Sequence, residues 1–290
     1  MNRLVHVPKK RREPSVAIAL GGGGARGLAH IAILEALDEL GVRPKAISGT
    51  SIGAIIGAAY AAGIEAKHLH AHVLDAMRNR SQVMGKLLKA RVGRFADLVL
   101  RGAGNPIMLD AEICLDLFWP ASVPDTFDEL NIPLFVVATD FHNRCEAVFS
   151  KGLLAPAVAG SMALPGLIKP VESGGRVLVD GGAVNPLPYD LLFGEADVVI
   201  AVDVTFGGRS RQRRVPSPFD SMFGAAQIMQ GAITAQKLKL RPPDILVRPA
   251  IEQFGVLEFH RAAQIVRAAE SAKDSIKREL AVQFEAHRSR

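Results

Sequence analysis

A single serine between two glycines constrains the fold of this chain more than any other feature. Gly49 and Gly53 stand two positions before and after Ser51. Residues 46–48 predict the end of a short buried strand, and the small residues of 52–62 predict a helix. A Gly-x-Ser-x-Gly turn from strand to helix holds the serine hydroxyl out at the top of a sheet. Glycine is needed on both sides because a side chain would collide where strand and helix pack together.

A glycine-rich loop lies between a predicted strand, Val16–Leu20, and a predicted helix, Leu28–Leu40. Its residues are Gly22, Gly23, Gly24, Ala25, Arg26 and Gly27. Backbone amides at a helix N-terminus can bind an anion. The anion is a pyrophosphate in the dinucleotide fingerprint and an oxyanion in acyl transfer. The dinucleotide interpretation requires a carboxylate at the end of the next strand, and residues 48–51 contain none. The loop is therefore a candidate oxyanion hole.

A third motif places a carboxylate at the end of a predicted strand. The strand is Val177–Val179, and Asp180 follows it, with Gly181 and Gly182 next. An Asp-Gly turn is the common interpretation of such a sequence. A carboxylate released at a strand end can also serve as the base that a serine nucleophile needs. Asp180 is thus a candidate catalytic base.

The eight histidines of the chain do not supply an obvious base. In a hydrolase with the order serine, aspartate, histidine, the histidine follows the aspartate. Only His260 and His287 follow Asp180, and neither has turn residues around it. His30 falls inside the first predicted helix, where a packed or solvated side chain is expected. We therefore favour a dyad in which Asp180 takes the proton of Ser51 directly.

The three motifs together resemble the patatin-like phospholipases, particularly their compact bacterial members. The resemblance rests on Gly22–Gly27, Gly49–Gly53, Asp180–Gly182, Gly160–Gly166 and Asn185–Pro188. It implies a lipid acyl hydrolase of the phospholipase A or lysophospholipase type, which forms an acyl-enzyme and uses no metal and no organic cofactor. By this resemblance Ser51 is the nucleophile, Asp180 is the base, and the amides of Gly22–Gly24 form the oxyanion hole.

The predicted fold is a three-layer α/β/α arrangement with a mostly parallel central sheet, as in patatin. Strands are predicted at the apolar runs Val16–Leu20, Leu134–Ala138, Val177–Val179 and Val198–Val204. Apolar runs without alternation are typical of parallel strands that are covered on both faces. Helices such as Leu28–Leu40 and Asp110–Phe118, with Asp110 placed to cap, would supply the covering layers.

Three regions are predicted along the chain. Residues 1–14 form a basic flexible tail, 15–204 a patatin-like catalytic domain, and 205–290 a helical extension packed on that domain. The extension contains predicted helices at Phe219–Leu240 and Glu258–Phe284, with a strand at Asp244–Arg248 between them. The last helix is either a solvent-facing cover or an oligomer contact, and the oligomeric state stays open.

Charge and composition limit the partners. The net charge is +6, and basic clusters lie at Lys9–Arg12 and within 209–214. Such clusters are either solvated or attracted to the headgroups of an anionic membrane surface. Nucleic acid is disfavoured because the chain has one Trp and two Tyr and lacks a binding motif. No segment reaches the roughly 18 apolar residues of a membrane span, and no signal peptide is apparent. Two cysteines form no disulfide framework. A cytoplasmic location is expected, with peripheral membrane association as an open alternative.

Some roles stay open at this stage. Arg26 is expected to face a substrate phosphate, a helix C-terminus or solvent. Burial should raise the pKa of Asp180 above the ordinary value of about 3.9. Residues 81–106 have apolar residues at helical spacing among basic ones, so they either pack on the core or form a mobile cover over Ser51 that meets lipid. A thioesterase, a small-ester hydrolase and a non-catalytic regulatory protein are the alternatives to a lipid acyl hydrolase.

Overall fold

The computed structural model describes residues 13–78, 91–92, 108–116, 118–205 and 215–289. Its main sheet contains β1 (Val16–Leu20), β2 (Ala46–Thr50), β5 (Leu134–Asp140), β6 (Cys145–Phe149), β7 (Val171–Ser173), β8 (Arg176–Asp180), β9 (Val198–Val202) and β10 (Ile245–Val247). Two short strands, β3 (Arg91–Val92) and β4 (Met108–Leu109), pair with each other outside that sheet.

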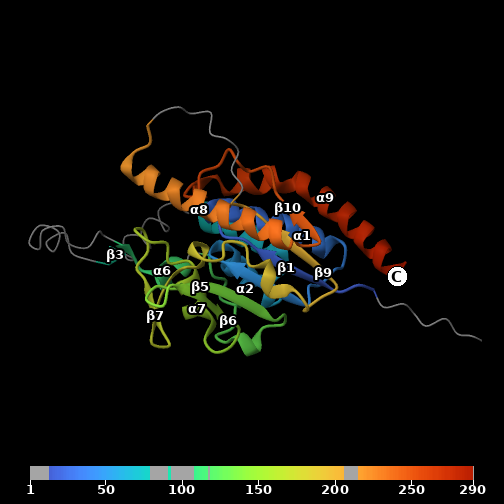
Figure 1. The fold of residues 1–290 in the computed structure, drawn as a ribbon, viewed down its shortest axis with the longest axis horizontal. Coiled ribbons are helices and arrows are strands. Elements are labelled where there is room, and N and C mark those ends of the chain that lie inside the picture. Colours follow the sequence, from blue (N-terminus) through green and yellow to red (C-terminus); the bar gives the residue numbers. More distant parts are fainter. Residues whose placement is uncertain (1–12, 79–90, 93–107, 117, 206–214, 290) are drawn as a thin grey trace, which may run out of the picture.

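The described helices surround the sheet (Figure 1). The α-helices are α1 (His30–Glu39), α2 (Ile52–Ala61), α3 (Ala66–Arg78), α6 (Ala111–Leu115), α7 (Leu154–Ser161), α8 (Pro218–Leu240) and α9 (Ala262–Arg288). Short 3-10 turns are η1 (Gly24–Ala29), η2 (Phe127–Glu129), η3 (Gly181–Ala183), η4 (Tyr189–Leu192) and η5 (Phe259–Arg261).

The sheet has the order β10-β9-β1-β2-β5-β8-β7, and β6 also pairs with β5. From β10 to β5 all neighbours are parallel, whereas β6 and β8 run antiparallel to β5 and β7 runs antiparallel to β8. The chain thus has the expected three-layer α/β fold with a mostly parallel central sheet.

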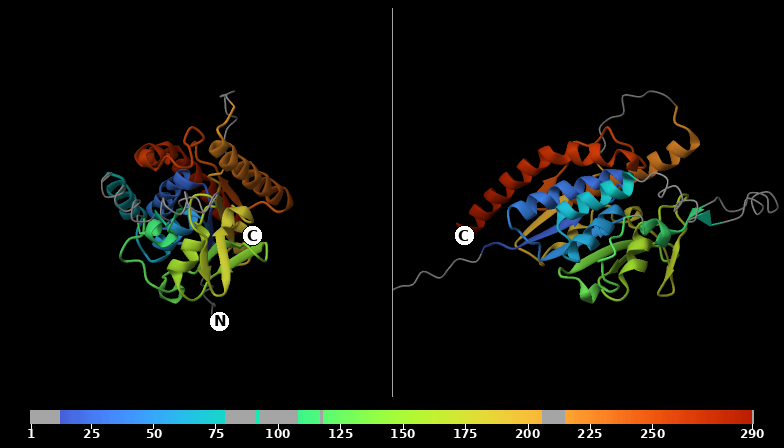
Figure 2. Two further views of the ribbon diagram at one scale, coloured as in Figure 1. Left: turned by 90° about the vertical axis from the view of Figure 1, so that its left-hand side faces the viewer. Right: turned by 180° about the vertical axis from the view of Figure 1, so that it is seen from behind.

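Alternating side chains of the strands pack against two different layers, as the period of a strand requires. On β1, Ile18 and Leu20 belong to a large core with α1, α2 and α9, whereas Ala17 and Ala19 face η4 and the end of α8. Figure 2 shows α9 beside α1, and the two helices are in contact. Small residues on the second face allow the η4 turn to approach the sheet closely.

The strand that ends at Asp180 runs in a direction that its apolar run did not predict. The uninterrupted apolar residues of Val177–Val179 predict a parallel strand, but β8 is antiparallel to both of its neighbours. Its continuous apolar run reflects burial, because α7 packs so closely that a Cβ on Gly160 would lie 2.7 Å from Leu178 Cδ1. Burial on both faces, and not strand direction, removes the alternation of polar residues.

Most predicted elements occur with small changes at their ends. The predicted helix Leu28–Leu40 begins as the 3-10 turn η1 and becomes α-helical at His30. Asp110 caps α6, since its side chain accepts hydrogen bonds from the amides of Glu112 and Ile113 at 3.0 and 3.2 Å. α7 was not predicted, and its Pro156 stands in the first turn, where proline is tolerated.

The described residues after 204 add a strand to the same sheet and helices to the same core. β10 extends the sheet beside β9, and α9 packs on α1 and on the η1 turn. The division into a catalytic domain and an extension stays a prediction. The amphipathic segment 81–106 lies outside the described residues, apart from the two residues of β3.

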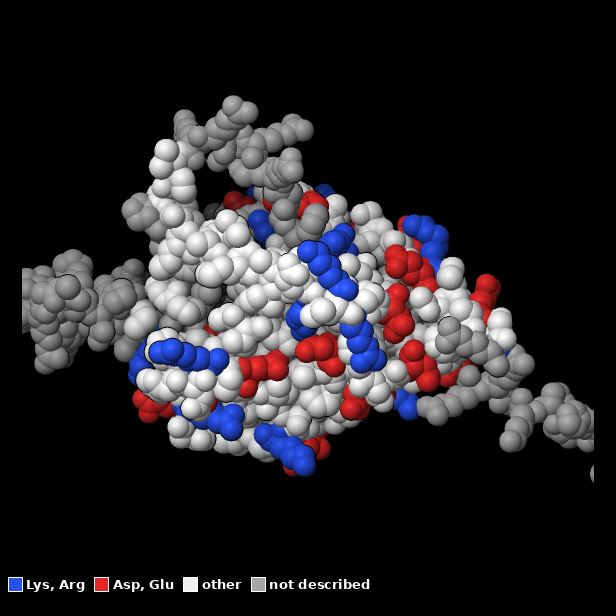
Figure 3. All heavy atoms as spheres, in the orientation of Figure 1, with Lys and Arg blue, Asp and Glu red and all other residues white. Residues whose placement is uncertain are grey.

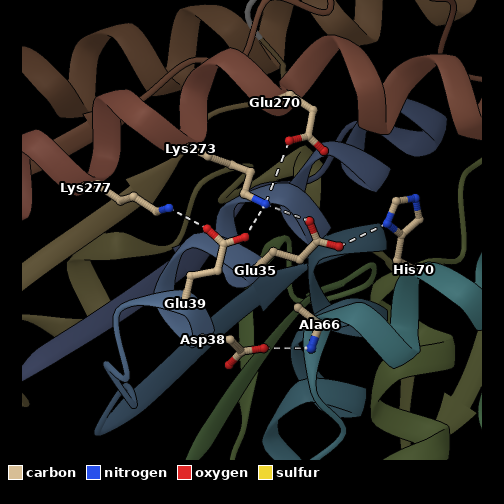
Figure 4. A network of polar contacts seen from close by, with 8 residues as sticks. All are labelled: Glu35, Asp38, Glu39, Ala66, His70, Glu270, Lys273 and Lys277. Atoms are coloured by element: carbon tan, nitrogen blue, oxygen red, sulfur yellow. Dashed lines mark hydrogen bonds and ion pairs between the residues drawn. The ribbon is translucent and has the colours of Figure 1, made fainter.

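A network of charged side chains joins α9 to α1 and α3 (Figure 4). The ammonium of Lys273 lies 3.1 Å from Glu35 Oε2 and 2.6 Å from Glu39 Oε1. Glu35 also contacts His70 Nδ1 at 3.0 Å, and Lys277 pairs with Glu39. Although burial acts to lower it, the carboxylates of Glu39 and Glu35 hold the pKa of Lys273 above its ordinary value. Lys273 therefore neutralises a carboxylate cluster between three helices.

Replacing Lys273 with methionine should lower the free energy of unfolding by about 2 kcal/mol at pH 7. This is less than the loss of about 3–5 kcal/mol for a fully buried pair, because Glu39 is 46% exposed. Urea denaturation measures the effect. Lys277→Met is the matched control, since that side chain is 31% exposed and pairs with Glu39. In Lys277→Met the free energy of unfolding should fall by less than about 1 kcal/mol. Equal decreases in the two variants would contradict a central role for Lys273.

Candidate active site

Ser51 sits in a strained turn between β2 and α2. Its backbone has φ 56° and ψ −124°, which is rare for a residue with a side chain. The turn is enclosed so tightly that a Cβ on Gly49 would lie 2.6 Å from the carbonyl oxygen of Gly53. A Cβ on Gly53 would lie 2.0 Å from the carbonyl oxygen of Leu20. The serine is thereby held at the N-terminus of α2, where the helix dipole favours negative charge.

Strand β5 brings Ser51 and Asp180 together. Thr50, the last residue of β2, is opposite Val137, and Asp180, the last residue of β8, is opposite Ala138. Val137 and Ala138 are consecutive, so the two strands end at adjacent positions along β5. Side chains separated by more than a hundred residues of sequence therefore meet at this edge.

Hydrogen bonds fix this junction. Ser161 Oγ accepts a hydrogen bond from the amide of Ser51 at 2.8 Å and donates one to the carbonyl of Val137 at 2.5 Å. Thr50 Oγ1 donates to the carbonyl of Asn185 at 2.8 Å, which ties the loop after Asp180 to the end of β2. Ser161 is a positioning residue that sequence reasoning missed, although it lies inside the segment Gly160–Gly166 that carried the resemblance.

The carboxylate of Asp180 is buried beside the serine. The amide of Gly182 donates a hydrogen bond to this carboxylate at 2.8 Å, and the Ser51 side chain lies beside it. Burial raises the pKa of Asp180 to about 6, and the interactions with Ser51 and Gly182 oppose the rise. An aspartate with this pKa is ionised at neutral pH and is a stronger base than an exposed one.

The glycine-rich loop lies against the serine. A Cβ on Gly22 would be 3.4 Å from Ser51 Cβ. The amide of Gly22 donates to the carbonyl of Pro186 at 2.9 Å, and the amide of Ala25 donates to that of Val256 at 2.8 Å. Within the described chain, no backbone carbonyl accepts from the amides of Gly23 or Gly24. The amides of Gly23 and Gly24 are therefore available to an anion, and the oxyanion hole of Gly22–Gly24 stays a prediction.

The remaining loop residues support its packing. Arg26 was expected at a substrate phosphate, a helix C-terminus or the surface, but its Nε donates to the carbonyl of Phe254 at 2.6 Å and the residue does not line the cavity. Burial lowers the pKa of Arg26. A Cβ on Gly27 would lie 2.1 Å from Ile52 Cγ2, so glycine allows η1 to contact the start of α2. On the other side, a Cβ on Gly181 would lie 2.2 Å from the carbonyl oxygen of Val137.

An apolar cavity of about 110 Å³ opens from Ser51 and Asp180. Its lining residues are Gly22, Gly23, Gly24, Ser51, Ile52, Ile55, Phe118, Met162, Leu164, Leu167, Ile168, Asp180, Phe223, Ala226, Gln227, Gln230, Val256, Leu257 and Phe259. The residues from α8 and from the loop 256–259 were not among the predicted site residues. Most of them are apolar, which core residues are as well, and the two glutamines of α8, Gln227 and Gln230, stand in no motif.

The described residues that line the cavity include no histidine. The Nε2 of the buried His30 donates a hydrogen bond to the carbonyl of Gly21 at 2.8 Å, and burial lowers the pKa of His30 to about 4. It therefore supports the glycine-rich loop as a neutral ring. His287 bonds to the carbonyl of Gln283 on α9 at 2.9 Å. In the described ranges no cluster of His, Cys, Asp and Glu side chains is placed to hold a metal ion.

The fold and site define a class: an α/β protein that presents a serine in a strand-to-helix elbow to a buried carboxylate. The family model named patatin-like phospholipase matches residues 18–193. The chain belongs to the patatin-like phospholipase family, as its motifs predicted. Among the described residues of the chain, no helix is long and apolar enough to cross a membrane.

Several relatives share this family. An uncharacterized NTE family protein of Mycobacterium tuberculosis is 38% identical over 192 residues, which is 66% of this chain and 49% of the relative. Lysophospholipase NTE1 of Pyricularia oryzae is 28% identical over 87% of this chain and 18% of its own length. Patatin-like phospholipase domain-containing protein 6 of Mus musculus is 32% identical over 66% of this chain and 13% of its own length.

The chain spans about half the length of the mycobacterial relative and less than a fifth of the length of the other two relatives. Among solved structures, VipD from Legionella pneumophila aligns with a TM-score of 0.48 and 15% identity, over 94% of this chain and 67% of that chain.

The pKa of Asp180 predicts the pH dependence of any reaction that uses it as a base. Because its pKa is raised to about 6, the rate of Ser51 acylation should fall about tenfold per pH unit below about pH 6. An aspartate at its ordinary pKa would keep the rate constant down to about pH 4. Stopped-flow acylation by a short nitrophenyl ester between pH 4 and 8 measures this. A rate that is flat down to pH 4 would contradict the raised pKa.

Proposed function

We propose that the protein is a serine acyl hydrolase that acts on lipid esters, of the phospholipase A or lysophospholipase type. One observation carries the proposal: Ser51, in a strained elbow, lies beside a buried Asp180 at the wall of an apolar cavity. The family and the relatives named lysophospholipase support the same substrate class. An apolar cavity suits an acyl chain, which gains free energy when it leaves water.

The proposed reaction proceeds in two halves. Ser51 Oγ attacks the ester carbonyl carbon while its proton passes to Asp180, and the amides of Gly23 and Gly24 stabilise the oxyanion. The carbon–oxygen bond to the alcohol then breaks, and Asp180 returns the proton to the leaving oxygen. In the second half, Asp180 takes a proton from water, whose oxygen attacks the acyl-enzyme. The fatty acid leaves as the proton returns to Ser51.

This assignment uses the protein alone and calls for no metal or organic cofactor. The same residues would open a thioester or a small ester, because acyl transfer to serine depends little on the group that leaves. A regulatory protein that binds acyl ligands without turnover is the alternative outside enzymes. The presence of both Ser51 and Asp180 at the wall of one cavity supports the enzyme. Contact with an anionic membrane surface belongs to this proposal, and the cytoplasmic location stays a prediction.

A fluorophosphonate probe should label the wild-type protein, because it phosphonylates activated serines. Ser51→Ala should abolish labelling, and Asp180→Asn should reduce its rate at least about a hundredfold, since a general base contributes about 10²–10⁴. The measurement is in-gel fluorescence over time. Phospholipid, lysophospholipid and acyl thioester substrates then identify the leaving group.

Ser221→Ala is the matched control, because that serine is exposed on α8 and does not line the cavity. Its labelling should equal that of the wild type. Thermal melting should show that Asp180→Asn is folded. A folded wild-type protein that neither labels nor hydrolyses any of these substrates would favour the regulatory protein.

From the lining of the cavity we expect one residue, Phe118, to determine the preference for the length of the substrate acyl chain. A second apolar void of about 10 Å³ lies behind the cavity, and Ile52, Ile55 and Phe118 line both. Removing the ring of Phe118 should join the two spaces. Phe118→Ala should therefore raise kcat/KM for hexadecanoyl relative to octanoyl nitrophenyl esters severalfold, since each buried methylene is worth about 0.8 kcal/mol.

Phe259→Ala is the control for this change. The rings of Phe259 and Phe118 are in contact, with centroids 5.2 Å apart, but Phe259 lines only the larger cavity. It should widen that cavity without joining the two. The same chain-length preference in both variants would contradict a partition by Phe118.

A further inference from the structure

Helix α8 has one face in the cavity and the opposite face in solvent. Its cavity face includes Phe223, Ala226, Gln227 and Gln230. The side chains on the outer face include Met222, Ala225, Ile228 and Met229, all exposed. The helix is therefore a wall one helix thick between the serine site and the exterior. In the orientation of Figure 1 it lies across the front of the molecule.

The outer face of α8 is unusually apolar for a surface helix. Ile228 is 74% exposed, Met229 is 60% exposed and Met222 is 49% exposed. From Ser221 to Gln236 the sequence contains no charged residue. The space-filling view of Figure 3 accordingly shows white atoms along most of this helix. A contiguous exposed apolar patch of this kind marks an interaction surface more often than a bare surface.

Positive charge borders the C-terminal end of this face, and the one acidic residue in the sequence of α8, Asp220, precedes Ser221. Lys239, also exposed, lies about three turns beyond Ile228 and thus on the same side of the helix. Arg241 follows, with its guanidinium 3.7 Å from the ring centroid of Phe193. Between Ser221 and Leu240 the sequence has no acidic residue. An apolar stripe ending in cations complements a bilayer, whose acyl region is apolar and whose headgroups can be anionic.

The far end of α8 is anchored to the catalytic edge of the sheet. Lys237 Nζ donates to Asn185 Oδ1 at 2.6 Å and to the carbonyl of Leu187 at 3.0 Å, and it pairs with Asp190. Asn185 is the residue whose carbonyl holds Thr50 beside Ser51. The exposed apolar face is thus held at a constant place relative to the serine. A surface that docks at α8 would lie directly over the wall of the cavity.

We infer that the outer face of α8, formed by Met222, Ala225, Ile228 and Met229, is the surface by which this protein binds an anionic phospholipid bilayer. A lipid that leaves the bilayer then reaches the serine by passing beside one helix, without crossing water. The cavity of about 110 Å³ is smaller than the roughly 300–1,000 Å³ of ligand pockets, so a long acyl chain needs one wall of the cavity to move, and α8 is one of these walls. When α8 moves outward, its apolar outer face enters the bilayer with which it is in contact. This inference deepens the proposed function and rests on it for the substrate.

Co-sedimentation with vesicles of equal parts phosphatidylcholine and phosphatidylglycerol tests the surface. The double variant Ile228→Glu, Met229→Glu should bind these vesicles at least about tenfold more weakly than the wild type, because it places charge where apolar area would be buried. Leu153→Glu and Val282→Glu are matched controls. Those residues are 63% and 64% exposed and lie outside α8, so both variants should bind like the wild type.

Two further readouts separate docking from chemistry. Fluorophosphonate labelling and hydrolysis of nitrophenyl butyrate in solution should be unchanged in the double variant, because neither Ile228 nor Met229 lines the cavity. Hydrolysis of phospholipid in vesicles should fall with binding. If the proposed hydrolase activity is wrong, no variant hydrolyses any ester, yet the difference in vesicle binding persists.

Two results would overturn the inference. The first is equal vesicle binding by the wild type and the double variant. The second is a wild-type dimer in light scattering that the double variant converts to a monomer without a change in vesicle binding, which would make this face a contact between protein chains.

Discussion

The meeting of two strand ends on one side of β5 is the constraint on which the site depends. Val136 and Val137 pair with both β2 and β6, while residues 138–140 pair with both β6 and β8. Because a strand has two edges, β2 and β8 must share the edge opposite β6. One is parallel and the other antiparallel to β5, so they approach each other and their carboxyl ends meet. A register shift of one residue would turn Asp180 to the other face of the sheet.

The surrounding packing maintains two features that are unfavourable by themselves. Ser51 keeps a positive φ, and the ionisable residue Asp180 is only 5% exposed. Strained backbone and buried charge persist only where neighbouring contacts determine the geometry. Here those contacts are the tight glycines of the elbow and the hydroxyl of Ser161, which bridges the Ser51 amide and β5. The same burial that costs stability raises the pKa of Asp180 and makes it a better base.

The C-terminal part of the chain completes the site and also shapes its outer surface. The family match ends at residue 193, yet α8 and the loop 256–259 supply much of the cavity wall. The carbonyl of Val256 accepts from the amide of Ala25, so this loop also fixes the glycine-rich turn. A helix with apolar side chains on both faces can line a lipid cavity and contact a bilayer at the same time. Binding and access are therefore linked through one element.

The sequence by itself determined the local features of this protein: the elbow around Ser51, the glycine-rich loop and the strands of a mostly parallel sheet. Each depends on residues within a few positions of one another, so backbone sterics and periodicity reveal it. Only the tertiary structure decided the direction of β8, the role of Ser161 and the part that α8 plays in the cavity. Those depend on contacts between residues far apart in sequence, where a buried serine or an apolar helix has no distinctive local pattern. Ser51 and Asp180 are far apart in sequence, and the pairing of β2 and β8 with β5 brings them together. No local pattern around either residue reveals that pairing.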